Sequence, residues 1–133
     1  MSWKGVKKQS LKTDIEAWCE EMGIQNYTIN DKGEIDVDGN IDLGHKNFKE
    51  LPYKFGRVNG FFDLGYNENL ISLKNCPNYI GGLFSCICCP QLDSLEGCPK
   101  ETGNDFWCVC CKRKFTEKEV RSLCKVSNNI YTT

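Results

Sequence analysis

Residues 51–116 decide the fold, because one pattern of 22 residues occurs there three times in succession. The copies are LPYKFGRVNGFFDLGYNENLIS (51–72), LKNCPNYIGGLFSCICCPQLDS (73–94) and LEGCPKETGNDFWCVCCKRKFT (95–116), and they align without a gap. A fixed period of this length indicates stacked supersecondary units, because one unit cannot bury its apolar edge alone. A weaker copy, one residue shorter, begins near Ile35, so we expect about four rungs.

Each copy contains the pattern F-x-(L/C)-x-x-(N/C)-x-x-L, in which apolar residues alternate with others at its start. Alternation over a few residues predicts a short strand with one buried side. Phe62 and Leu64 are expected to point inward, and Phe61, Asp63 and Gly65 outward. The sequence therefore predicts one short strand in each rung of a stack.

The repeated segment resembles the leucine-rich repeat, whose core reads L-x-L-x-x-(N/C)-x-L. Ser72-Leu73-Lys74-Asn75-Cys76-Pro77 and Ser94-Leu95-Glu96-Gly97-Cys98-Pro99 are also similar to SL-x-G-C-P repeats carried by bacteriophage proteins. The resemblance covers roughly residues 35–115 and brings no catalytic motif. It implies a leucine-rich-repeat-like β-solenoid and, by analogy with small phage accessory proteins, a protein that binds and inhibits a host protein such as an antiviral-defence component.

Length and composition indicate one α+β domain over residues 1–133. We expect an N-terminal helix and hairpin cap (1–34), the rungs (35–115), and a C-terminal helical cap with a tail (116–133). The chain has 40% hydrophobic residues but no long apolar run, so no membrane span is expected. Its first ten residues lack the apolar region of a secretory signal, which favours the cytoplasm, and the host cytoplasm if a phage encodes the chain.

The first predicted helix covers residues 11–22 and should cover the open end of the stack. Thr13 and Glu16 have capping-box spacing, and Gly23 suits a left-handed C-cap. One face of this helix is apolar and should be buried: Leu11, Ile15, Trp18 and Met22. Two short strands around a turn at residues 31–33 should follow, within residues 27–37.

The second predicted helix begins after Thr116 and should run to about Lys125. Thr116 as N-cap with Glu119 three residues later forms a capping box, and Phe115 with Val120 forms a hydrophobic staple. Its buried side should include Val120, Leu123 and Cys124. The tail, with Ile130 and Tyr131, is expected either to dock as an edge strand or to be disordered.

The chain contains ten cysteines, and eight of them form four pairs separated by one repeat. This spacing favours small apolar repeat positions, because free cysteine is among the most buried residue types. Cys19 and Cys124 fall outside the register, on the expected buried sides of the two helices. The sequence analysis therefore assigns no cofactor, and disulfides are not expected.

A zinc site is the alternative interpretation of the cysteines. Two stacked rungs could bring sulfur atoms close to one tetrahedral metal ion. The candidate ligands are Cys86, Cys88, Cys89, Cys108, Cys110 and Cys111. Cys88 and Cys110 share the column of Tyr66, just beyond the strand, where partial exposure is expected.

The outward strand positions carry apolar residues where a solvated face should be polar. An exposed apolar strip with acidic residues at its rim is typical of a protein-binding surface. The predicted contact residues are Phe61, Asp63, Leu83, Ser85, Ile87, Asp105, Trp107 and Val109, with Trp107 as anchor. The alternatives are that Ile130 and Tyr131 cover this strip, or that it forms a homodimer.

The first functional hypothesis is therefore a non-enzymatic protein-interaction module. No paired-carboxylate, nucleophile–base or phosphate-loop signature indicates an enzyme. With 17 basic and 18 acidic residues, general attraction to nucleic acid is not expected. The second hypothesis is a zinc-stabilised module that binds nucleic acid through its basic C-terminal end, at Lys112, Arg113, Lys114, Lys118 and Arg121.

Overall fold

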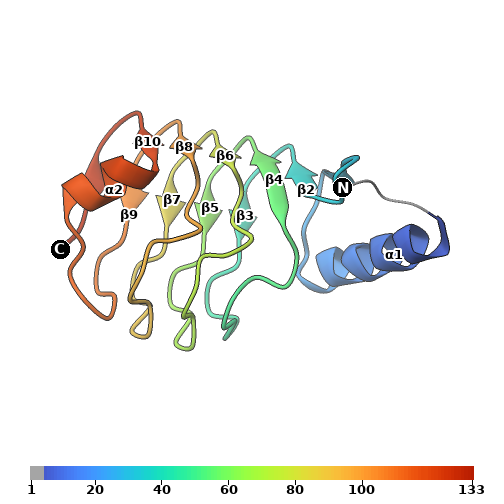
Figure 1. Cartoon of the computed structure of the whole chain (residues 1–133), viewed down its shortest axis with the longest axis horizontal. Coiled ribbons are helices and arrows are strands. Elements are labelled where there is room, and N and C mark those ends of the chain that lie inside the picture. The colour runs from blue at the N-terminus through green and yellow to red at the C-terminus, as the bar shows by residue number, and fades with distance from the viewer. Residues whose placement is uncertain (1–4) are drawn as a thin grey trace.

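The chain winds into a β-solenoid in which each rung contributes one short strand to each of two sheets (Figure 1). The computed structural model describes residues 5–133, with side chains from residue 9 onward. Sheet A has the order β1-β2-β4-β6-β8-β10 and consists of β1 (Tyr27–Ile29), β2 (Ile35–Val37), β4 (Phe55–Val58), β6 (Tyr79–Ile80), β8 (Glu101–Thr102) and β10 (Lys125–Val126). Sheet B has the order β11-β9-β7-β5-β3 and consists of β3 (Ile41–Asp42), β5 (Phe62–Asp63), β7 (Phe84–Ser85), β9 (Phe106–Trp107) and β11 (Ile130–Tyr131).

The rungs stack in register, and all neighbouring strands are parallel except the hairpin of β1 and β2. In sheet B, one column contains Ile41, Phe62, Phe84, Phe106 and Ile130. The predicted repeat solenoid of about four turns is confirmed. The sheet A strands of the later rungs, β4, β6, β8 and β10, were not predicted from the sequence.

A column of phenylalanine rings fills the space between the two sheets. Phe62, Phe84 and Phe106 are completely buried. The ring centroids lie 6.4 Å apart for Phe62 and Phe84 and 5.0 Å apart for Phe84 and Phe106. Because replacing a buried phenylalanine by alanine costs about 3–5 kcal/mol, this column is a main source of stability. Leu64 is also fully buried, as the alternation predicted.

The N-terminal helix α1 (Gly5–Glu21) begins earlier than predicted. Thr13 lies inside it and donates to the carbonyl oxygen of Gln9, so the prediction of a capping box at Thr13 is wrong. Ile15 and Cys19 are buried as predicted, whereas Leu11 is 43% exposed because that part of the helix extends beyond the stack (Figure 1). The backbone of Gly23 is left-handed (φ 73°), as expected after the helix.

Trp18 connects α1 to the first rungs. Its ring lies 6.1 Å from Phe48, 5.7 Å from Tyr53 and 6.0 Å from Phe55. The predicted hairpin follows as β1 and β2, with a turn at Gly33 (φ 78°). The sequence also has a basic run near its N-terminus, at Lys4, Lys7 and Lys8, which lies outside the residues whose side chains are described.

The C-terminal helix α2 (Glu117–Leu123) begins as predicted and ends two residues early. The capping box is confirmed, since Thr116 accepts from the backbone of Glu119 and the Glu119 carboxylate accepts from the backbone of Thr116. Val120 and Cys124 are buried, but Leu123 is 46% exposed, so its predicted burial is wrong. Two further strands, β10 and β11, follow α2, so the helix occupies the connection before the last rung (Figure 1). Within residues 5–133, no helix is long and apolar enough to cross a membrane.

Candidate functional site

The outer face of sheet B carries the predicted contact residues in three columns. Backbone pairing places Phe61, Leu83 and Asp105 at one position of successive rungs, immediately before the strands. The strands place Asp63, Ser85 and Trp107 in a second column. Ile87 and Val109 lie in a third, immediately after the strands, with the Ile87 side chain beside Gly65. The solenoid therefore brings all eight residues onto one surface.

Seven of the eight predicted residues are partly exposed, and Ser85 is the exception. Ser85 is only 6% exposed, so the prediction that it lies open on this surface is wrong. Its hydroxyl turns back and accepts from the backbone N–H of Ile87 at 3.4 Å. A short side chain between larger neighbours is covered by them, which leaves Ser85 with a structural role.

The sequence analysis missed an aromatic pair at the C-terminal edge of this face. Tyr131 in β11 stacks on Trp107, with ring centroids 4.0 Å apart and planes inclined by 24°. The tail docks as an edge strand, so it extends sheet B and does not cover it. If the strand pattern of the repeat is continued past α2, Tyr131 falls at the same strand position as Trp107. We define the binding face as Phe61, Leu83, Ile87, Trp107, Val109 and Tyr131.

Aspartates border the binding face, and their carboxylates accept hydrogen bonds from the backbone of nearby turns. The Asp42 and Asp63 carboxylates accept from the backbone N–H groups two residues later, at 3.0 and 2.8 Å. Asp105 accepts from the backbone N–H of Asn129 at 3.0 Å. These bonds fix the carboxylates in place, so the rim of the face carries ordered negative charge.

The cysteines of the alternative zinc site do not form one cluster. Cys86, Cys89 and Cys108 are buried between the sheets, whereas Cys110 is exposed on the outside. Burial raises the pKa of Cys89 to about 11 and that of Cys108 to about 12, which disfavours the thiolate needed for a metal. Among the described side chains, no group of three or more His, Cys, Asp or Glu residues could hold a metal ion. All ten cysteines are free.

Asn67 and the cysteines of its column connect successive rungs from inside. The Asn67 amide makes hydrogen bonds to both the rung before it and its own rung. Cys89 donates to the carbonyl oxygen of Leu64 at 3.4 Å, and Cys111 to that of Cys86 at 3.3 Å. Cys89 therefore fills a small core position, as the repeat spacing predicted, and the partly buried Cys111 packs against the core.

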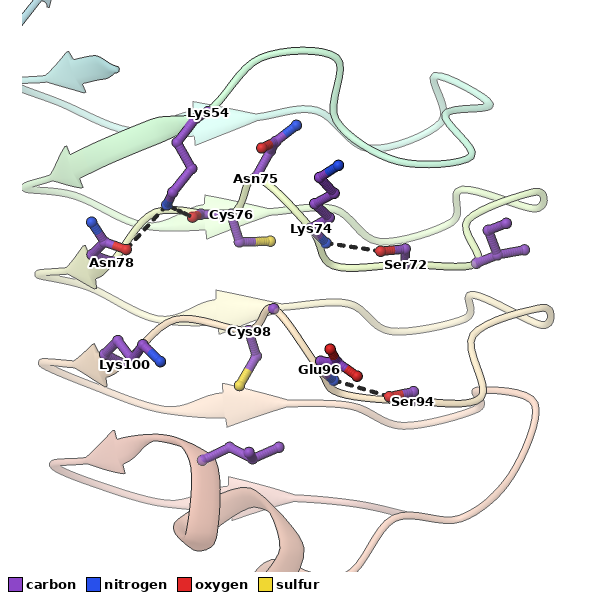
Figure 2. A pocket seen from close by; sticks show the side chains of 13 residues that line it. Lys54, Ser72, Lys74, Asn75, Cys76, Asn78, Ser94, Glu96, Cys98 and Lys100 are labelled. Carbon is purple, nitrogen blue, oxygen red and sulfur yellow. Dashed lines mark hydrogen bonds between the residues drawn. The ribbon is translucent and has the colours of Figure 1, made fainter. Parts of the chain in front are cut away.

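A groove of about 650 Å³ crosses the loops that contain the two Ser-Leu-x-x-Cys-Pro segments (Figure 2). Lys54 points along its floor and donates to the carbonyl oxygen of Phe55 at 2.8 Å, to that of Cys76 and to Asn78 Oδ1 at 3.1 Å. Ser72 and Ser94 accept from backbone N–H groups two residues later. The polar groups on the floor thus join the loops to one another, and the charged side chains of Lys74, Glu96 and Lys100 also line the groove.

Two of the basic residues in the nucleic-acid alternative are engaged by carboxylates. Arg113 contacts Glu119 at 2.7 Å and Asp93 at 3.6 Å. Arg121 contacts Glu117 at 3.0 Å. These ion pairs reduce the positive charge that this end could offer to phosphate groups. Comparison with protein-family models, curated proteins and solved structures finds no match for this chain.

Proposed function

We propose that this chain is a non-enzymatic module that recognises a partner protein with its binding face. The observation that supports this proposal best is the contiguous apolar surface, all of it partly exposed, on one side of sheet B. Such patches mark interaction sites in soluble proteins. Tryptophan and tyrosine are enriched among the residues that dominate binding energy, and the stacked pair of Trp107 and Tyr131 offers both.

The charges around the binding face specify the chemistry of the partner. Asp42, Asp63 and Asp105 form an acidic border, so the complementary surface is apolar with basic residues around it. The resemblance to leucine-rich repeats and to phage repeat proteins supports the finer proposal of a host protein inside the infected cell that is bound and inhibited. This finer proposal rests on that analogy alone. We also propose that α1 and the β1–β2 hairpin protect the N-terminal end of the stack.

The experiment compares two variants that place the same carboxylate on different surfaces. Leu83→Asp lies in the centre of the binding face, and Ile71→Asp lies on the loop side, where Ile71 is 57% exposed. Partners are captured from the native cell with tagged wild-type protein and quantified for each variant. We expect Leu83→Asp to weaken capture by about 30-fold or more, equivalent to about 2 kcal/mol, and Ile71→Asp to leave it unchanged.

Thermal unfolding of both variants shows whether they remain folded. Equal capture by folded Leu83→Asp and wild type would refute the proposal. Sedimentation distinguishes a homodimer, because a wild-type dimer that becomes monomeric in Leu83→Asp would show that the face binds a second copy of the chain.

A further inference from the structure

A second surface lies at the corner that follows each strand of sheet B. His45, Tyr66, Cys88 and Cys110 occupy one position of four successive rungs there, and we call them the turn ladder. The backbone N–H groups of His45, Tyr66 and Cys88 donate to carbonyl oxygens of the next rung at 3.2, 2.8 and 2.8 Å. The rings of His45 and Tyr66 stack with centroids 4.8 Å apart. The four side chains therefore form an ordered row.

All four residues of the turn ladder have left-handed backbone conformations, with φ values of 58°, 60°, 54° and 59°. Glycine and asparagine adopt this conformation at least cost. Elsewhere in the described chain, every residue with positive φ is one of these two types: Asn26, Asn47, Asn75, Gly23, Gly33, Gly39 and Gly97. A left-handed backbone at residues other than glycine and asparagine is strained, and such strain points to a function.

The two thiols of the turn ladder lie next to each other and are open to solvent. Cys88 is partly exposed and Cys110 is exposed, and stacked rungs are about 4.8 Å apart. Tyr66 holds the same position in the rung before Cys88. Together with His45, Glu68 and Pro90 these residues line an open hollow of about 320 Å³.

The chemistry of this pair favours a soft cation over a catalytic nucleophile. The two thiols hold the same position of adjacent rungs, share a left-handed backbone and line one hollow, so they offer two sulfur ligands to one ion. Thiolates select soft metals such as copper(I), which two of them can hold.

We infer that Cys88 and Cys110 form a two-thiolate site for copper(I). Two S–H bonds break, two Cu–S bonds form, and two protons pass to solvent, so Cu⁺ and two thiols give an anionic bis-thiolate complex without any change in oxidation state. This site is separate from the binding face and does not depend on the proposed function.

The test measures copper(I) affinity of the intact chain under anaerobic, reducing conditions, by competition with a chromophoric copper(I) chelator. The wild type should bind one equivalent. Cys88→Asn and Cys110→Asn should each bind at least about 100-fold more weakly, since losing an outer-shell partner alone costs about 10–100-fold. Asparagine suits the left-handed backbone, so both asparagine variants should unfold at or above the wild-type temperature.

Two control variants should keep wild-type affinity. Cys111→Asn removes a neighbouring thiol at a position where the earlier rung has Asn67, and His45→Asn removes the far end of the turn ladder. Affinity should fall about 100-fold per unit decrease in pH, because two protons are released. Wild-type affinity in the Cys88→Asn/Cys110→Asn double variant, an equal loss in Cys111→Asn, or an affinity independent of pH would each overturn the inference.

Discussion

Replacing Asn67 by alanine removes a fully buried amide that joins two rungs. Its nitrogen donates to the carbonyl oxygens of Leu43 at 3.0 Å and Leu64 at 2.8 Å. Its oxygen accepts from the backbone N–H groups of Lys46 at 3.0 Å and Phe48 at 3.3 Å. Four hydrogen bonds at about 1 kcal/mol each predict a loss of roughly 3–4 kcal/mol, a large share of the about 5–15 kcal/mol that stabilises a typical domain.

The loss is measured by equilibrium urea unfolding followed by circular dichroism, with wild type and variant compared at equal m-value. Asn59→Ala is the matched control, because Asn59 is exposed and its side chain donates to Asp38 at 3.0 Å on the surface, so it should change stability by less than about 0.5 kcal/mol. Cys89→Ala, which removes one weak donor of the same column, should lie between the two. A cost for Asn67→Ala of under about 1 kcal/mol, or no greater than that of Asn59→Ala, would refute the reasoning.

Three further predictions concern thiols, acid stability and the aromatic pair. Only Cys88, Cys110 and Cys111 are not buried, so a thiol reagent should modify three cysteines quickly in native metal-free protein and all ten after denaturation; fewer than ten in denaturant would reveal disulfides. The Arg113 guanidinium and the Thr116 backbone N–H lower the pKa of Glu119 from 4.5 to about 2, so its contribution is complete above pH 4.5 and is lost as pH falls toward 2. Glu119→Gln should therefore show a smaller fall in Tm than wild type across this range, and parallel curves would contradict the assignment. Double-mutant cycles of Trp107→Ala and Tyr131→Ala should give a coupling of about 0.5–1.5 kcal/mol in urea unfolding, whereas additive losses would show that the stacking contributes nothing.

The strong periodicity of the sequence explains which parts of the fold could be predicted. Phe62, Phe84 and Phe106 recur at equal spacing because each fills the same core position. The sequence therefore predicts the length of the repeat, the stacking of the rungs and the side of the strand that faces the core. Sheet A was missed because its buried column, Val58, Ile80 and Thr102, does not repeat one residue type as the phenylalanine column of sheet B does.

Signals that depend on tertiary contacts were harder to read. The α2 capping box is local, so Thr116 and Glu119 predicted it correctly. Burial of Leu11 and Leu123 depends on what lies beside each helix, and helical spacing alone cannot supply that. The pairing of Tyr131 with Trp107 required knowing that the repeat resumes after a helix has interrupted it.

The positive φ of the turn ladder was not foreseen, because neither tyrosine nor cysteine indicates a left-handed backbone. Only the stacked geometry shows that Cys88 and Cys110 share this conformation with Tyr66. The 22-residue repeat places these three residues in one column, so their stacking could be predicted from the sequence. Their backbone conformation could not.

Photo-crosslinking in the native cell tests the central claim most directly. A benzophenone amino acid is introduced at Trp107 on the binding face or at Ile71 on the loop side, which is 57% exposed. We predict a crosslink to one distinct protein from position 107 and none to that protein from position 71. Crosslinks to the same proteins with equal yield from both positions would contradict the proposal that the outer face of sheet B recognises the partner.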